Sequence, residues 1–138
     1  MKKLVCFLAL TPVCAFAQTL STLGPNNGSG GVFFDLTPTT NNLSFNSFAT
    51  YLGSATVGTP ASIQVWVRTG SYVGFTTANT GWTLYETVVG NAAGTSTLTA
   101  PIAFTTPISL TAGTTTGFYI HSVTSANGIR GDLLEAKW

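Results

Sequence analysis

The chain has 138 residues, of which 44% are hydrophobic and only 7% are charged. This apolar fraction excludes intrinsic disorder, which requires low hydrophobicity. Five Lys and Arg side chains, two of them at positions 2 and 3, exclude the clustered basic surface that a nucleic-acid binder or a polybasic membrane contact needs.

Residues 1–17 have the pattern of a cleavable signal peptide. Lys2 and Lys3 precede an apolar run, and Ala15 and Ala17 stand at the −3 and −1 positions of a cleavage site before Gln18. The apolar run is shorter than the roughly 20 residues of a transmembrane helix. We therefore expect export to an extracytoplasmic location, secreted or on the cell surface, with no transmembrane segment in the mature chain. A buried N-terminal helix and a lipid anchor on Cys14 are the alternatives.

Removal of residues 1–17 changes the charge and the cysteine content of the chain. Both cysteines, Cys6 and Cys14, leave with the signal peptide, so the mature chain has no disulfide. The remaining charged residues are Arg68, Arg130 and Lys137 against Asp35, Glu86, Asp132 and Glu135. The mature protein is therefore nearly neutral, and we expect it not to bind nucleic acid.

The remainder of the chain consists of short alternating segments separated by turn residues, which predicts an all-β fold. The clearest strand, Ser62–Arg68, alternates Ile63, Val65 and Val67 with Gln64, Trp66 and Arg68. The other predicted strands are Val32–Leu36, Leu43–Phe48, Trp82–Val89, one or two strands within Pro101–Leu110, and Thr116–Val123. Pro107 predicts an edge strand or a bulge.

We expect a single antiparallel, jelly-roll-like β-sandwich of about seven strands. The predicted organisation is a signal peptide at 1–17, a flexible Gly/Asn/Ser-rich lead at 18–31, the sandwich domain at 32–127, and an atypical tail or truncated edge at 128–138. The tail holds four charged residues, which favours a fragment whose continuation is missing, although a short helix or a frayed end would fit too. It also spells the tripeptide Arg130-Gly131-Asp132, which recurs by chance.

Three motifs resemble a β-sandwich module of secreted bacterial surface proteins, often found with PEP-CTERM or gliding-associated C-terminal sorting signals. They are GSYVGF at 70–75, GWTL at 81–84, and LTAG at 110–113 ahead of GFYI at 117–120. The likeness covers roughly residues 28–130. Such modules usually continue with further strands and a sorting signal, and we expect both to be missing from these 138 residues. The resemblance implies display outside the cell and contact with cell-surface or extracellular matrix components. It implies no established chemistry.

No catalytic arrangement is evident in the sequence. Asp35 and Glu86 are the carboxylates before the tail, and nothing in the sequence brings them together as a glycosidase pair would require. His121 is the single histidine, and no G-x-S-x-G elbow accompanies it. We expect no enzyme activity, no catalytic residue, no metal site and no cofactor. A structural calcium ion bound through Asp35 and backbone carbonyls is the alternative.

Four aromatic residues are candidates for ligand binding: Trp66, Tyr72, Phe75 and Trp82. Exposed rings can stack on the faces of sugars. In the alternative interpretation Trp66 covers a second core layer, and Tyr72 and Phe75 pack their loop. We expect a non-catalytic structural or adhesive surface module, with a carbohydrate-binding module as the second hypothesis and polysaccharide as its partner.

Overall fold

The computed structural model describes residues 20–21 and 30–130, and within these ranges the secondary structure is entirely β. The strands are β1 (Leu20–Ser21), β2 (Gly31–Leu36), β3 (Leu43–Ala49), β4 (Tyr51–Leu52), β5 (Pro60–Thr69), β6 (Thr83–Asn91), β7 (Ile102–Leu110), β8 (Thr116–Ser122) and β9 (Ile129–Arg130). The predicted all-β class is therefore confirmed. The six long strands lie close to the segments predicted from alternation.

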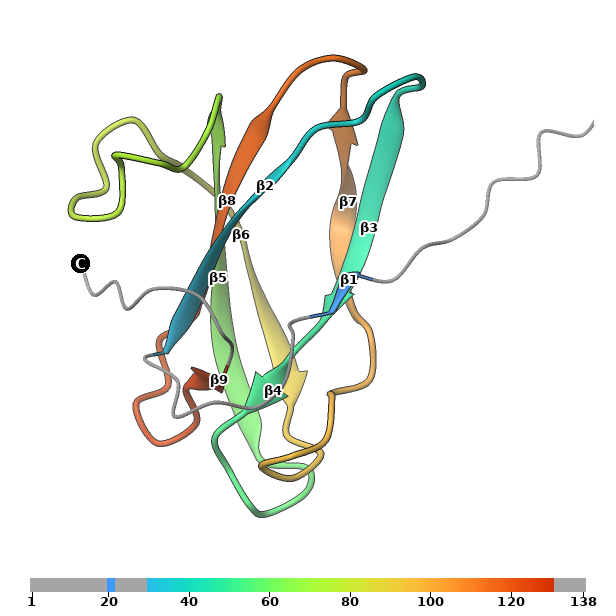
Figure 1. The fold of residues 1–138 in the computed structure, drawn as a ribbon. Helices are drawn as coiled ribbons and strands as arrows, with labels where there is room; N and C mark the ends of the chain where they lie inside the picture. The colour runs from blue at the N-terminus through green and yellow to red at the C-terminus, as the bar shows by residue number, and fades with distance from the viewer. Residues whose placement is uncertain (1–19, 22–29, 131–138) are drawn as a thin grey trace, which may run out of the picture.

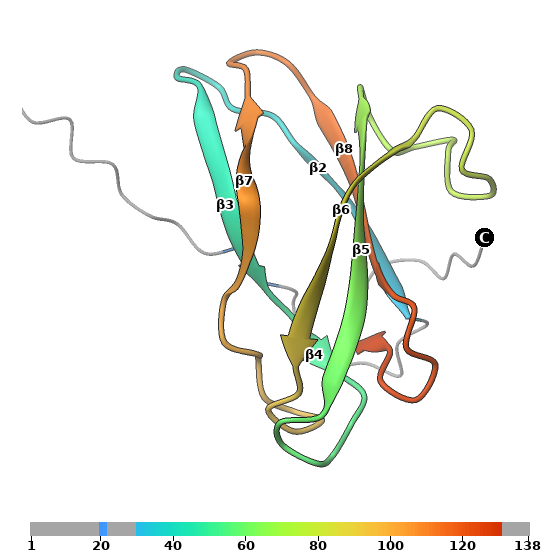
Figure 2. The ribbon, with the colours of Figure 1, turned by 180° about the vertical axis from the view of Figure 1, so that it is seen from behind.

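The strands form two main sheets and one small ribbon. The larger sheet has the order β2-β8-β5-β6 and is antiparallel throughout. The second sheet has the order β1-β3-β7, in which β3 and β7 are antiparallel and the short β1 runs parallel to β3. Strands β4 and β9 pair with each other. In Figures 1 and 2 the β3–β7 pair and the larger sheet lie as two layers.

An apolar core lies between the two sheets. The ring of Phe45 on β3 lies edge-on to Phe118 on β8, with 5.4 Å between the ring centroids. Phe45 also contacts Phe104 on β7 at 5.1 Å. Both sheets therefore turn an apolar face towards the same core.

The alternation on β5 sets the two faces of the larger sheet. Ile63 and Val65 are fully buried in the core, as the period of two predicts. Gln64, Trp66 and Arg68 are on the opposite, outer face and are partly buried. β5 lies between β8 and β6, so its outward residues occupy the middle of that face.

A register shift on β6 ties the edges of the two sheets together. Val65 pairs with Glu86 whereas Trp66 pairs with Leu84, which leaves Tyr85 as the extra residue of a bulge. The Tyr85 hydroxyl donates to the carbonyl of Thr106 at 2.9 Å. The Glu86 carboxylate accepts from the backbone N–H of Thr105 at 3.1 Å. Both side chains thus reach β7.

Strand β7 is a single strand at the edge of its sheet. Its register with β3 shifts between Phe45 and Ser47: Phe45 pairs with Ile108, whereas Ser47, two residues later, pairs with Ala103, five residues earlier on β7. Pro107 lies within this irregular stretch, as the sequence predicted for a bulge or an edge.

Two of the predicted domain boundaries need correction. Ile129, within the predicted tail at 128–138, is fully buried, and β9 pairs with β4. Leu20–Ser21, within the predicted flexible lead, pair with β3. The packed fold therefore extends beyond residues 32–127 on both sides. The predicted signal peptide at 1–17 and residues 131–138 lie outside the described residues, so Arg130 is the one described member of its tripeptide.

Candidate functional site on the outer face of the larger sheet

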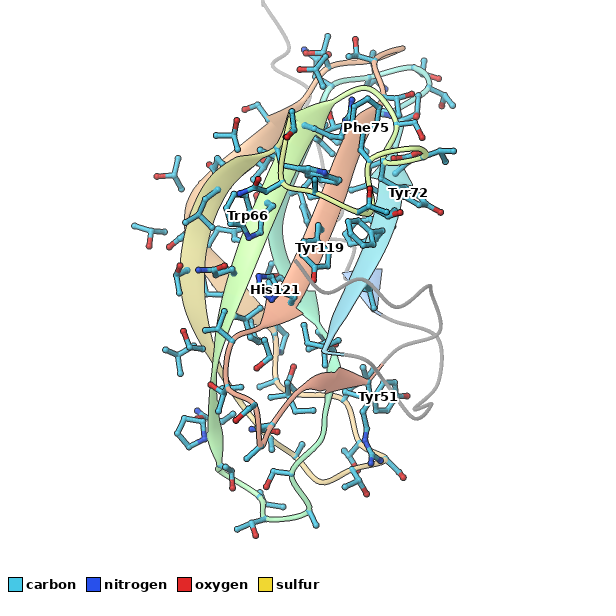
Figure 3. The ribbon with its side chains drawn as sticks, turned by 90° about the vertical axis from the view of Figure 1, so that its left-hand side faces the viewer. Tyr51, Trp66, Tyr72, Phe75, Tyr119 and His121 are labelled. Atoms are coloured by element: carbon cyan, nitrogen blue, oxygen red, sulfur yellow. The ribbon has the colours of Figure 1, made fainter. Side chains whose placement is uncertain are left out.

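A second apolar cluster lies on the outer face of the larger sheet. Strand pairing places Phe33 on β2, Tyr119 on β8 and Trp66 on β5 in one row across the sheet. Phe33 and Tyr119 stack with 4.1 Å between their centroids. Trp82 packs onto the same cluster, which we call the outer aromatic cluster, together with the partly buried Tyr72 and Trp66. Figure 3 looks onto this face, with Trp66, Tyr119 and His121 along the strands.

The segment 70–82 covers one end of this face. It leaves β5 at Gly70, whose φ of +85° is a backbone conformation that favours glycine. The carboxylate of Asp35 accepts hydrogen bonds from the Ser71 hydroxyl at 2.6 Å and from the Tyr72 N–H at 2.9 Å. The Trp82 indole N–H donates to the Phe75 carbonyl at 2.8 Å, which closes the segment on itself. Segment 70–82, which we call the covering loop, is therefore docked on the sheet.

Arg68 lies beneath the covering loop. Its guanidinium carbon is 3.1 Å from the centroid of the Phe75 ring and 5.7 Å from that of Trp82, a cation–π arrangement. Its Nε and Nη1 atoms are buried and have no hydrogen-bond partner among the described residues. Arg68 thus holds the loop through its ring contacts.

The four predicted ligand-binding aromatics share one face but do not form a single exposed platform. Trp82 is only 8% exposed and belongs to the outer aromatic cluster. Tyr72 is partly buried and stacks on Phe33 at 5.8 Å. Phe75 is 41% exposed and covers Arg68. Trp66 is partly buried and faces outward, away from the core between the sheets.

Two polar residues beside Trp66 were not predicted as site residues. The side-chain oxygen of Gln64 accepts a hydrogen bond from the Trp66 indole nitrogen at 3.2 Å. The same oxygen lies 3.0 Å from Nε2 of His121, whose ring stacks on Tyr119 at 4.8 Å. Alternation on β5 could have placed Gln64 beside Trp66. The approach of His121 depends on the pairing of β5 with β8, which no local pattern encodes.

Burial changes the acid–base properties of two residues on this face. Burial raises the pKa of Tyr119 to about 12. Burial also lowers the pKa of His121, and a hydrogen-bonding contribution from the Ser122 backbone opposes this shift. Burial thus favours the uncharged form of both side chains.

The two carboxylates considered as a catalytic pair, Asp35 and Glu86, each form hydrogen bonds to a different part of the fold. Asp35 holds the covering loop on the outer face, and Glu86 bonds to Thr105 of β7. Among the described residues no group of three or more His, Cys, Asp or Glu side chains gathers as a metal site would require.

A groove of about 390 Å³ lies between the edges of β6 and β7. Its walls include Glu86, Val88, Pro101 and Ile102. None of the residues that line it belongs to the outer aromatic cluster, so the two features are distinct.

The described residues contain no helix of the length and apolarity that crossing a membrane demands. Comparisons with known proteins found no matching family model, no similar curated protein and no similar solved structure.

Proposed function

We propose that this protein is a non-catalytic, extracytoplasmic structural or adhesive surface module of the kind that its sequence resembles. The observation that carries the proposal is the docking of the covering loop. Tyr72, Trp82 and Phe75 pack on Phe33 and Arg68, so these rings serve to hold a shaped loop on the sheet. A rigid loop on a rigid sheet suits a module that presents a fixed surface to a partner.

The engagement of the carboxylates supports a non-catalytic role. A pair of acids working on one substrate must flank a shared site. Asp35 bonds to Ser71 on the outer face, whereas Glu86 bonds to Thr105 at the junction of β6 and β7. Each carboxylate therefore has a structural partner, and the two bind different elements.

Two measurements on the full chain test this proposal. The first expresses residues 1–138 in a bacterial host and determines the N-terminus of the exported protein by mass spectrometry. Gln18, or its cyclised form, is expected, and retention of Met1 or lipid on Cys14 would overturn the export mechanism. The second compares adhesion of protein-coated beads to cell-envelope and extracellular matrix material for the wild type and for Gly117→Ala. A Cβ atom at residue 117 of β8 would meet the backbone of Gly70 and Tyr72 in the covering loop, so this variant is expected to disturb the loop. Equal, background-level adhesion of both would overturn the adhesive role.

Carbohydrate binding is the second candidate, and the surroundings of Trp66 favour it. An outward-facing indole ring beside a Gln amide and a His ring combines an apolar face with hydrogen-bonding groups. Sugars present the same combination of apolar C–H faces and hydroxyl edges. Under this candidate the site is Trp66 with its polar neighbours, and Tyr72, Phe75 and Trp82 support it from the loop.

A panel of soluble polysaccharides in affinity electrophoresis tests the second candidate. Retardation of the wild-type protein by at least one polymer, lost in Trp66→Ala, is the expected result. Migration unaffected by every polymer would leave the adhesive module without a sugar ligand and remove this candidate.

A further inference from the structure

The hydrogen bonds around Gln64 define the orientation of its side-chain amide. An indole nitrogen can only donate, so the atom of Gln64 that faces Trp66 Nε1 at 3.2 Å must be the oxygen. The reverse orientation would set the amide NH2 against the indole N–H. The same oxygen faces His121 Nε2 at 3.0 Å, and this nitrogen must therefore carry a hydrogen.

The oxygen of Gln64 thus accepts two hydrogen bonds, which occupies both of its lone pairs. The amide nitrogen has no hydrogen-bond partner among the described residues. The buried side-chain nitrogen and oxygen atoms that lack a partner in this part of the chain belong to Thr50 and Arg68. Gln64 is partly buried and its Nε2 is not one of these atoms, so this nitrogen is not fully enclosed and can offer its N–H groups to a ligand.

The surroundings of these donors are apolar or uncharged. Strand pairing places Leu84 beside Trp66 and Thr87 beside Gln64 on the same face, and Leu84 is 41% exposed. The nearest cation along β5, Arg68, is covered by the Phe75 ring. Among residues 30–130, a ligand at this position therefore meets an aromatic face and neutral donors, and no free cation for a carboxylate or phosphate.

We propose that Gln64 is a specificity-determining residue, whose fixed N–H groups donate to a hydroxyl of a neutral polysaccharide stacked on Trp66. The proposal rests on the carbohydrate-binding candidate above. It adds that the ligand is uncharged, and that Trp66 has two roles: its ring supplies the stacking surface, and its N–H orients the Gln64 amide. His121 acts as the second positioning residue for that amide.

Gln64→Glu in the full-length, exported protein is the decisive variant. A carboxylate oxygen can still accept from Trp66 and His121, but the donors are lost. Affinity electrophoresis would use a neutral β-glucan and the carboxylated polymer polygalacturonate as probes. We expect the wild type to bind the glucan more tightly, and Gln64→Glu to weaken glucan binding about three- to tenfold, the range for one neutral hydrogen bond. Asn46→Asp is the matched control, because Asn46 is exposed on the other sheet and its side-chain oxygen likewise accepts a hydrogen bond, from Ser44.

Each outcome decides the proposal. Weaker glucan binding by Gln64→Glu, with thermal unfolding and the Asn46→Asp control unchanged, supports it. Glucan binding that is lost in Trp66→Ala but unchanged in Gln64→Glu would overturn the role of Gln64 and leave the carbohydrate-binding function standing. Preference of the wild type for polygalacturonate would overturn the neutral ligand class. Binding of neither polymer would overturn the inference while leaving an adhesive role intact.

Discussion

Asp35 on β2 and Ser71 in the covering loop are joined by a hydrogen bond of 2.6 Å, although 36 residues separate them in the chain. The second oxygen of Asp35 accepts from the backbone N–H of Tyr72. One carboxylate thus fixes the start of the loop to the edge strand of the larger sheet. This relationship explains why a charged residue interrupts the apolar strand Gly31–Leu36.

The first prediction concerns this anchor. Asp35→Ala should lower the free energy of unfolding by about 2–3 kcal/mol, because a hydrogen bond to a charged group contributes about 1.5–3 kcal/mol. Urea unfolding measures this loss, and limited proteolysis should show faster cleavage within residues 71–81. Asp35→Asn keeps one acceptor oxygen and should lose less. An Asp35→Ala protein whose loop is cleaved at the wild-type rate would contradict the anchoring role.

The second prediction tests the close approach of the loop to the sheet at Gly117. A Cβ atom at this position would lie 2.9 Å from the Gly70 carbonyl oxygen and 3.0 Å from the Tyr72 backbone nitrogen. Backbone atoms cannot move aside as a side-chain end can, so Gly117→Ala should cost about 1–3 kcal/mol through overpacking. Gly53→Ala is the control, because a Cβ atom added at Gly53 would lie no closer than 3.4 Å to a neighbouring heavy atom, an ordinary contact distance. Equal melting temperatures for the two variants would contradict the prediction.

Local pattern was sufficient to predict the six long strands, but it could not predict the short strands β1 and β9 or the loop that covers the larger sheet. The alternation of Ile63 and Val65 with Gln64 and Trp66 identified both faces of β5, because side-chain direction in a strand has a period of two. Trp82 was also a candidate for an exposed ligand-binding ring, yet it is buried against Phe33 and Tyr119. That burial requires the loop to fold back over the sheet, a long-range contact without a local signature.

Asn127 illustrates the same limit at the other end of the chain. With Gly128 it reads as a turn, which is a correct local description. Its side chain is fully buried, accepting from the Ser54 N–H at 2.8 Å and donating to the Thr59 carbonyl at 3.1 Å. Its partners are about 70 residues away, so the sequence gives no sign that this amide supports the fold.

The third prediction concerns alkaline pH and Tyr119. The pKa of this phenol is raised from 10.0 to about 12 by burial, so the folded state resists its ionisation. Ionisation of Tyr119 should leave the free energy of unfolding unchanged below pH 10. The free energy of unfolding should fall as the pH rises from 10 towards 12, because Tyr119 ionises at a lower pH in the unfolded chain than in the folded protein. The loss from this group approaches about 2–3 kcal/mol, at 1.36 kcal/mol per pKa unit. Urea unfolding between pH 8 and 12 measures it, and Tyr119→Phe should flatten the profile; an unchanged slope in that variant would assign the loss elsewhere.

The fourth prediction concerns mildly acidic pH and His121. Burial lowers the pKa of this imidazole below its ordinary value of 6.5. The unfolded chain therefore takes up a proton first as the pH falls, and the free energy of unfolding should decrease from pH 6.5 downward. Urea unfolding at pH 5 to 8 measures this slope. His121→Asn should remove it, whereas a slope that persists in this variant would show that another group is responsible.

The last prediction separates the core from the outer face by two neighbouring residues on β5. Val65 is fully buried between the sheets, so Val65→Asp should prevent folding. An unpaired buried charge costs several kcal/mol, a large part of the about 5–15 kcal/mol that stabilises a domain. Trp66 is partly buried on the outer face, and its indole bonds to Gln64. Trp66→Ala should therefore fold and lose about 1–3 kcal/mol, less than the roughly 3–5 kcal/mol typical of a fully buried aromatic ring.

Circular dichroism and urea unfolding of both variants check this difference, and polysaccharide retardation of Trp66→Ala then bears on function. If Trp66 serves only to pack the outer aromatic cluster, the variant loses stability. Its binding to a partner, corrected for the unfolded fraction, then equals that of the wild type. If its ring also meets a ligand, sugar binding disappears under conditions where the variant is fully folded. A Trp66→Ala protein that fails to fold would place this ring among the essential core residues, and it would contradict the division between core and outer face on which both candidate functions depend.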